Sequence, residues 1–126
     1  MRQQQPDVLV IDDHLDTCDL LVHALRRLGV EAQCATGGEE ALDYLHDHRP
    51  ALVLLDMNMP HVDGCHVLRS MRRDAHLRAV PVIAFTGAGE KACEDALRLG
   101  ANEFLIKGLV SMPDILRCVG KFIAEN

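Results

Sequence analysis

Five short segments rich in Val, Leu and Ile recur along this chain, alternating with stretches whose apolar residues are spaced like one face of a helix. The five segments comprise residues 8–11, 30–35, 51–55, 80–85 and 103–106. Such an alternation is typical of a parallel sheet with right-handed crossovers and helices on both faces. We therefore predict an α/β, doubly wound fold with five parallel strands and five helices.

The ends and patterns of several predicted elements carry local signals. Residues 51–55 are wholly apolar, which predicts a strand buried on both faces. Residues 30–35 alternate apolar and polar side chains, which predicts a half-exposed strand at the edge of the sheet. Asp63 is expected to cap one helix, and Ser111 with Asp114 forms a capping motif before the last one.

The length and charge of the chain limit its function classes. With 126 residues it has the size of one domain, and we expect residues 1–126 to form that domain. No apolar run is long enough to cross a membrane, and the first residues resemble no signal peptide. The formal net charge of -6 opposes direct binding of nucleic acid. One local basic group is expected to be a solvated helix face; it comprises Arg69, Arg72, Arg73 and Arg78.

The cysteines and histidines show no familiar spacing. The cysteines are Cys18, Cys34, Cys65, Cys93 and Cys118. Their odd number and wide spacing favour neither a disulfide framework nor a zinc site. We expect them to be free thiols that fill the places of small apolar residues, in a reducing compartment. The 7 histidines are expected at the surface, and none of them is expected to bind metal.

Chemically active side chains follow four of the five predicted strands. They are Asp12, Asp13, Asp56, Thr86 and Lys107. Because parallel strands point their carboxyl ends the same way, these side chains should meet at one edge of the sheet. Neighbouring carboxylates repel one another unless a divalent cation lies between them. Since the pattern contains neither Cys nor His, its oxygen ligands favour Mg²⁺ over zinc.

This arrangement suits a phosphoryl group. Magnesium held by few carboxylates keeps positions for phosphate oxygens and water, and Lys107 adds positive charge. Phosphoryl transfer depends on positioning and charge neutralisation, and an aspartate can be the nucleophile. We therefore expect Asp56 to become an aspartyl phosphate, with Thr86 and Lys107 assisting.

At these residues the chain resembles the receiver domains of two-component response regulators, over residues 6–125. The resemblance is carried by Asp12-Asp13, by Leu55 to Pro60 with Asp63-Gly64 beyond it, by Thr86 and by Lys107. It implies a flavodoxin-like fold with strand order 2-1-3-4-5. It also implies a magnesium site formed by Asp13, Asp56 and the backbone carbonyl of Asn58, with Asp12 holding metal-bound water. No effector domain is expected within residues 1–126.

The resemblance also implies a switch. Thr86 matches the switch hydroxyl of the family, and Phe104 stands where the family has an aromatic residue that changes rotamer. Gly108 departs from the proline that commonly follows the lysine, so the geometry of that loop does not carry over. Asn58 and Ala88 flank the expected path of the attacking water, and we expect them to tune the lifetime of the phosphoryl group.

The expected function is therefore signalling. A histidine kinase or histidine phosphotransfer protein would phosphorylate Asp56, and slow autodephosphorylation would remove the group without making the chain an enzyme. The surface of the fourth helix, the fifth strand and the last helix would then signal to an unidentified downstream protein. We expect a cytoplasmic location without membrane contact, and a phosphorylation-dependent homodimer stays open.

Three alternatives are also considered. An aspartate-nucleophile phosphohydrolase would usually need a second acid two residues after the nucleophile, where Asn58 stands. A flavin-binding protein would need a phosphate loop rich in glycine and hydroxyl groups after the first strand, where Asp12-Asp13-His14 stands. A module that interacts independently of phosphorylation fits less well, because the acids, the threonine and the lysine are all present.

Overall fold

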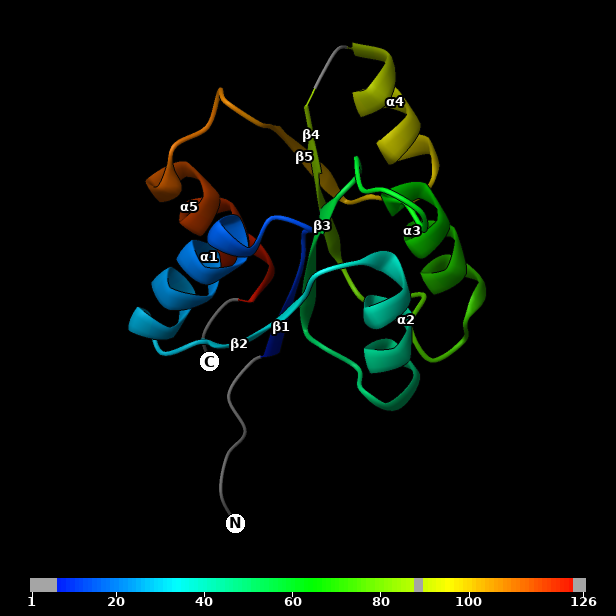
Figure 1. The fold of residues 1–126 in the computed structure, drawn as a ribbon, viewed down its shortest axis with the longest axis horizontal. Helices are drawn as coiled ribbons and strands as arrows, with labels where there is room; N and C mark the ends of the chain where they lie inside the picture. Colours follow the sequence, from blue (N-terminus) through cyan, green and yellow to red (C-terminus); the bar gives the residue numbers. More distant parts are fainter. Residues whose placement is uncertain (1–6, 88–89, 124–126) are drawn as a thin grey trace.

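The computed structural model describes residues 7–87 and 90–123 and contains a five-stranded parallel sheet in the order β2-β1-β3-β4-β5 (Figure 1). The strands are β1 (Asp7–Ile11), β2 (Glu31–Ala35), β3 (Leu52–Asp56), β4 (Val82–Thr86) and β5 (Glu103–Ile106). The helices are α1 (Leu15–Arg27), α2 (Gly38–Asp47), α3 (Gly64–Arg73), α4 (Glu90–Arg98) and α5 (Met112–Phe122). The α/β, doubly wound, flavodoxin-like fold predicted from the sequence is confirmed.

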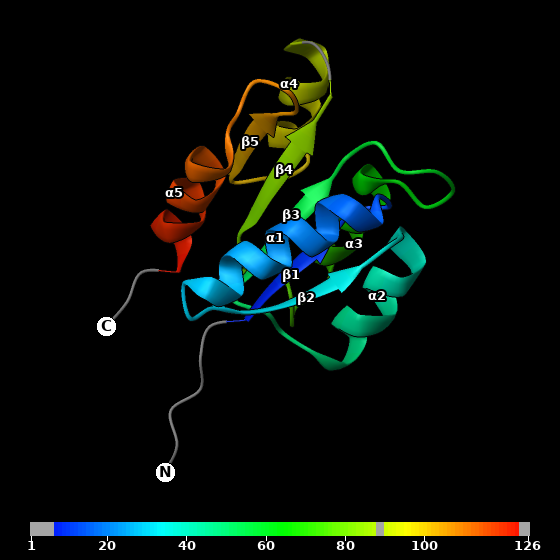
Figure 2. The same cartoon turned by 60° about the vertical axis from the view of Figure 1, so that its left-hand side comes forward.

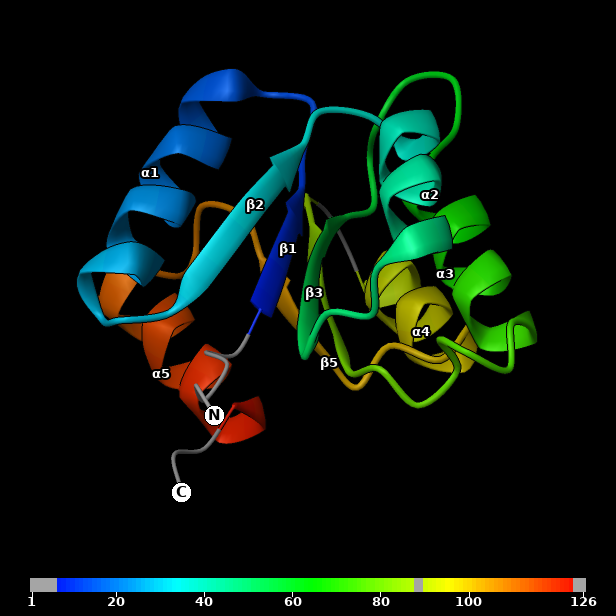
Figure 3. The same cartoon turned by 90° about the horizontal axis from the view of Figure 1, so that it is seen from below.

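The sheet separates two aliphatic cores. Helices α1 and α5 cover one face, and α2, α3 and α4 cover the other (Figures 1 and 3). Side chains alternate between the faces along each strand, so Val10 and Leu54 pack under α1 and α5 whereas Ile11 and Leu55 pack under the other three helices. β3 is buried along its whole length, and β2 at the edge is half exposed, as the two sequence patterns predict.

The predicted helix caps are present. Asp63 accepts a hydrogen bond from the backbone N–H of His66 at 3.0 Å and so begins α3. Ser111 and Asp114 form a reciprocal capping box at the start of α5. These caps fix where α3 and α5 begin, and therefore the lengths of the loops that follow β3 and β5.

Arg72 corrects the prediction that its arginine group is a solvated helix face. Arg69, Arg73 and Arg78 are exposed, but Arg72 is half-buried. Its guanidinium donates to the carbonyl oxygens of Gly100 and Val80 at 2.8–3.0 Å, and also to the Asn102 side chain. Arg72 therefore ties α3 to the turns before β4 and β5, at the end of the sheet opposite the predicted site.

The cysteine prediction is wrong for one pair. Cys18 on α1 and Cys34 on β2 form a disulfide, with their Cα atoms 5.9 Å apart. Cys65, Cys93 and Cys118 are free, as expected. The pair escaped sequence reasoning because α1 lies over the edge strand β2, a proximity that residue spacing does not encode.

The described helices contain none that combines the length and the apolar character needed to cross a membrane. This agrees with the absence of a long apolar run in the sequence.

Candidate functional site

The register of the strands brings the predicted site residues to one edge of the sheet. All strands point toward that edge, as their arrowheads in Figure 2 show. Ile11 lies opposite Leu55, so Asp12 follows directly beside Asp56. Asp56 lies opposite Phe85, and Thr86 lies opposite Ile106, so Thr86 and Lys107 complete the row. The predicted convergence is therefore a consequence of parallel pairing.

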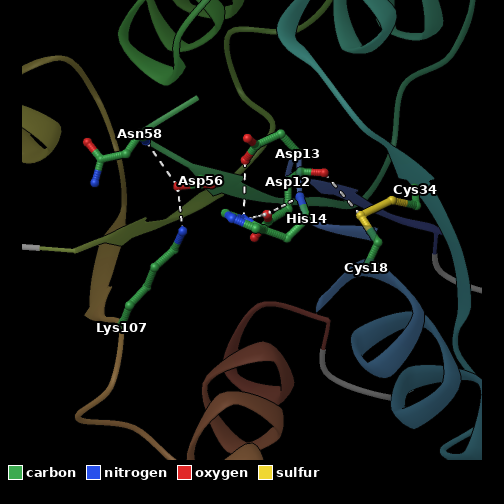
Figure 4. A network of polar contacts seen from close by, with 8 residues as sticks. All are labelled: Asp12, Asp13, His14, Cys18, Cys34, Asp56, Asn58 and Lys107. Carbon is green, nitrogen blue, oxygen red and sulfur yellow. Dashed lines mark hydrogen bonds and ion pairs between the residues drawn. A yellow bond between two sulfur atoms is a disulfide. The ribbon is translucent and has the colours of Figure 1, made fainter. Parts of the chain in front are cut away.

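Asp56 occupies the centre of this edge, and its side chain is fully buried. Its Oδ1 lies 2.9 Å from the Lys107 ammonium and accepts a hydrogen bond from the Asn58 backbone N–H at 3.0 Å (Figure 4). Its Oδ2 is buried and has no hydrogen-bond partner within the described part of the chain. One oxygen is thus fixed, and the other is left available to a ligand.

The environment of Asp56 raises the pKa of its carboxyl group above the ordinary value. The largest cause is burial, which penalises the charged form. The hydrogen bonds from Lys107 and Asn58 and the charge of Lys107 oppose this shift, and the charge of Asp12 adds to it. Asp56 is consequently an acid whose charge the surrounding protein balances only in part.

The neighbouring acids turn toward Asp56. Asp12 is buried and Asp13 is partly exposed. The backbone N–H of His14 donates to Asp12 Oδ1 at 2.9 Å, which shapes the turn after β1. Asp13 Oδ1 is buried and has no hydrogen bond of good geometry to any described residue. Two buried carboxylate oxygens at this site, Asp13 Oδ1 and Asp56 Oδ2, therefore have no hydrogen-bond partner among the described residues.

His14 lies beside these acids, although the ligand pattern predicted from the sequence contains no histidine. Its Nδ1 lies 3.1 Å from Asp12 Oδ1 and 3.3 Å from Asp13 Oδ1 (Figure 4). One ligand atom from each of Asp12, Asp13, His14 and Asp56 lies within 4.8 Å of the others. The side chain of His14 is 65% exposed, so its predicted surface location is confirmed. Its ring nitrogen nevertheless belongs to the group of possible metal ligands, which was not predicted from the sequence.

Thr86 and Lys107 approach from the other side of Asp56. The backbone N–H of Lys107 donates to the Thr86 carbonyl at 2.8 Å, which joins the ends of β4 and β5. Thr86 is fully buried, and its Oγ1 lies 3.5 Å from Cys93 Sγ on α4. Gly108 has φ +85, a left-handed conformation that the proline of the family could not adopt. The backbone of the loop after Lys107 therefore differs from that of family members with proline at this position.

The remaining predicted residues are placed as follows. The Asn58 side chain points away from the carboxylates (Figure 4), and a Cβ atom on Gly87 would lie 3.3 Å from its Nδ2. Phe104 is half-buried and packs against the core on the side of α2, α3 and α4. Ala88 lies outside the described residues.

The donor set fits a small divalent cation. Two buried carboxylate oxygens have no hydrogen-bond partner in the described part of the chain, and one of them belongs to a fully buried side chain. They would carry a large desolvation penalty unless a cation neutralised them. Hard oxygen ligands of this kind suit Mg²⁺. The acidic cluster is consistent with the metal site of receiver domains.

Comparison with known proteins decides the family. A family model for the response regulator receiver domain matches residues 8–119. The chain belongs to this family. It is 30% identical over 118 residues to the polar-differentiation response regulator DivK of Brucella anthropi, with 94% of this chain and 96% of that protein covered.

Solved structures of receiver domains share the fold. A response regulator receiver protein from Pseudomonas putida is 30% identical, with a TM-score of 0.86 and 95% and 99% of the two chains covered. The chemotaxis protein CheY4 of Vibrio cholerae is 22% identical, with a TM-score of 0.87 and coverage of 94% and 99%, and supports the fold alone. This receiver domain therefore has the family's architecture, and the carboxylates of Asp12, Asp13 and Asp56 lie together in one cluster.

Sequence reasoning missed two residues beside this pocket. His14 was missed because its role depends on a ring turned back toward its neighbours, and no spacing rule records that. Cys18 was treated as a small apolar residue, yet its Sγ lies 3.3 Å from the Asp12 carbonyl oxygen. The only sequence signal that could have indicated His14 is its position directly after Asp12-Asp13.

Proposed function

We propose that this receiver domain accepts a phosphoryl group on Asp56 from the phosphohistidine of a histidine kinase or a histidine phosphotransfer protein. A carboxylate oxygen of Asp56 would form the new bond to phosphorus while the bond to the histidine nitrogen breaks. The observation that carries the proposal is the fully buried Asp56 carboxylate, with one oxygen held by Lys107 and the other unpartnered among the described residues.

A Mg²⁺ ion belongs to this proposal. Asp13, Asp56 and the backbone carbonyl of Asn58 would hold it, and Asp12 would orient a water molecule bound to it. When bound, the ion supplies charge that offsets the negative charge of the phosphoryl oxygens. The buried oxygens Asp13 Oδ1 and Asp56 Oδ2, which have no hydrogen-bond partner among the described residues, support this assignment.

Lys107 and Thr86 are proposed to bind the phosphoryl oxygens. The ammonium of Lys107 already lies against Asp56, so a short movement would bring it to a phosphoryl oxygen. The hydroxyl of Thr86 lies beside Cys93 on α4, and its rotation toward the phosphoryl group would change the packing of that helix. Thr86 would therefore be the switch, with Phe104 on β5 responding to it.

The proposed output is a changed surface on α4, β5 and α5, read by a separate downstream protein that this structure does not identify. Asn58 and Ala88 are proposed to set the lifetime of the phosphoryl group by controlling the access of water. A cytoplasmic location is part of the same proposal.

The test is chemical labelling of the 126-residue chain. Incubation with a small phosphodonor and Mg²⁺ should give a phosphoprotein that is stable in acid and labile in base. Asp56→Asn should abolish the label, while Asp43→Asn, which changes an exposed acid on α2, should retain it. Absence of label on the wild-type chain, or label that survives Asp56→Asn, would refute the proposal.

The same experiment separates the alternatives. Rapid multiple turnover of phosphomonoesters would favour a phosphohydrolase, although Asn58 stands where such an enzyme usually has its second acid. Partner binding that is unchanged by Asp56→Asn would favour a module that acts independently of phosphorylation. Stoichiometric labelling with slow loss supports the receiver function.

A further inference from the structure

His14 stands at the acidic cluster with a nitrogen atom turned toward the acids. It precedes α1 as the N-cap residue, but its side chain makes no capping hydrogen bond to that helix. Instead, Nδ1 lies 3.1 Å from Asp12 Oδ1 and 3.3 Å from Asp13 Oδ1. The imidazole is therefore oriented toward the cluster by contacts with the acids themselves.

The cluster has ligand atoms that are close enough to share one ion. One atom from each of the three carboxylates and from the imidazole lies within 4.8 Å of the others. A metal with ligand bonds of about 2.1 Å holds opposite ligands about 4.2 Å apart, so only small adjustments are needed. The unpartnered Oδ2 of the fully buried Asp56 independently indicates that a ligand belongs here.

A nitrogen ligand changes which cation such a site prefers. Mg²⁺ is a hard ion that is bound through oxygen and keeps several water molecules. Imidazole is a good ligand for first-row transition metals, whose affinities for a given site generally rise from Mn²⁺ toward Cu²⁺. An imidazole beside three carboxylates therefore adds affinity for transition metals that it does not add for Mg²⁺.

We propose that His14 is a nitrogen ligand of this metal site, which raises the affinity of the site for transition-metal dications such as Mn²⁺ relative to its affinity for Mg²⁺. This inference rests on the metal site of the proposed function and deepens it. Nδ1 coordinates the cation through its lone pair, and the single proton of the neutral ring then resides on Nε2. The exposure of the His14 side chain gives the ring freedom to make this adjustment.

The test uses Mn²⁺ as the probe, with the whole 126-residue chain. Electron paramagnetic resonance of free Mn²⁺ gives the affinity, and pulsed measurements on bound Mn²⁺ detect coupling to an imidazole nitrogen. Mg²⁺ affinity is measured in parallel by competition. His14→Ala removes the ligand without removing a helix cap, and His23→Ala is the matched control because it changes an exposed histidine of the same helix.

The expected result is an imidazole nitrogen coupling in the wild-type chain and in His23→Ala, and its loss in His14→Ala. Mn²⁺ affinity should fall about tenfold in His14→Ala, while Mg²⁺ affinity changes less than about twofold. Absence of the coupling in the wild-type chain, or its persistence in His14→Ala, would overturn the inference.

Labelling of Asp56 distinguishes this failure from failure of the proposed function. If the chain is phosphorylated with Mg²⁺ but shows no nitrogen coupling with Mn²⁺, the role of His14 is refuted and the receiver function stands. If neither cation binds and no label appears, both are refuted.

Discussion

The ammonium group of Lys107 lies 2.9 Å from Oδ1 of Asp56, and Oδ2 of the same carboxylate is buried without a hydrogen-bond partner in the described regions. A single lysine therefore faces a cluster that contains three acids. Burial raises the pKa of Asp56 even though Lys107 opposes the shift. The site is therefore suited to bind a ligand that brings positive charge. Without such a ligand, the buried charge of Asp56 lowers the stability of the folded chain.

Asp56→Asn should increase the stability of the chain at neutral pH in a chelating buffer. The native pKa of Asp56 is raised, so the native state binds more protons than the unfolded state between the two pKa values. Stability of the wild-type chain therefore falls as the pH rises through that window, and asparagine removes this loss. We therefore expect Asp56→Asn to have a higher free energy of unfolding than the wild-type chain at pH 7, measured by urea unfolding.

The gain should shrink as the pH falls toward the unfolded pKa of about 3.9, because the wild-type carboxyl then becomes protonated. Asp43→Asn, at an exposed position, should change the free energy of unfolding by less than about 0.5 kcal/mol at every pH. An Asp56→Asn chain that is no more stable than wild type at pH 7 would contradict the claim that the charge of buried Asp56 is only partly balanced by its surroundings.

The meeting of Asp12, Asp56, Thr86 and Lys107 at one edge could be predicted because parallel strands send their carboxyl ends the same way. That inference needs only the periodicity of apolar residues, whereas the strand order was implied by the resemblance to receiver domains. His14 and Arg72 could not be predicted, since both depend on the direction in which a long side chain turns. The Cys18–Cys34 pair depends on how a helix lies over an edge strand, which the sequence does not specify.

Arg72→Lys should destabilise the chain by about 2–4 kcal/mol, because an ammonium cannot replace the planar guanidinium donors. Three carbonyl groups, those of Gly100, Val80 and Arg78, accept hydrogen bonds from Arg72. Burial lowers the pKa of Arg72, as expected for a guanidinium partly withdrawn from water.

The matched control for this change is Arg73→Lys, at an exposed neighbouring position, which should shift the free energy of unfolding by less than about 0.5 kcal/mol. Labelling of Asp56 should persist in both variants under native conditions, since Arg72 lies at the opposite end of the sheet. Equal stability of the two variants in urea unfolding would show that Arg72 is only a surface charge.

Reduction of the Cys18–Cys34 disulfide should lower the free energy of unfolding by about 3 kcal/mol, because the bond constrains the unfolded chain across a sequence separation of 16 residues. The non-reduced chain should contain three reactive thiols after denaturation, from Cys65, Cys93 and Cys118. Urea unfolding with and without dithiothreitol measures the difference. Cys34→Ser should make stability insensitive to the reductant, whereas Cys65→Ser should not; five thiols in the non-reduced chain would refute the bond.

Ala88→Met should slow the loss of phosphate from Asp56 several-fold, because a larger side chain would screen the phosphoryl group from water. The Asn58 amide lies close to Gly87, and we expect Asn58→Ala to admit water and accelerate the loss. Decay of the labelled protein after removal of the phosphodonor gives both rates. Unchanged rates in both variants would exclude these positions from control of the lifetime.

Thr86→Val should leave Asp56 phosphorylated but weaken the response of α4, β5 and α5. Valine retains the shape of the buried threonine and removes only the hydroxyl, which lies 3.5 Å from Cys93 Sγ. Without that hydroxyl, the phosphoryl group cannot form a hydrogen bond to residue 86 on β4. The packing of α4 against β4 should then change less on phosphorylation. Backbone amide shifts in nuclear magnetic resonance spectra, recorded before and after phosphorylation, should therefore be smaller across the three elements. Thr86→Ser keeps the hydroxyl and should retain the full response; a full response in Thr86→Val would show that the signal travels by another route.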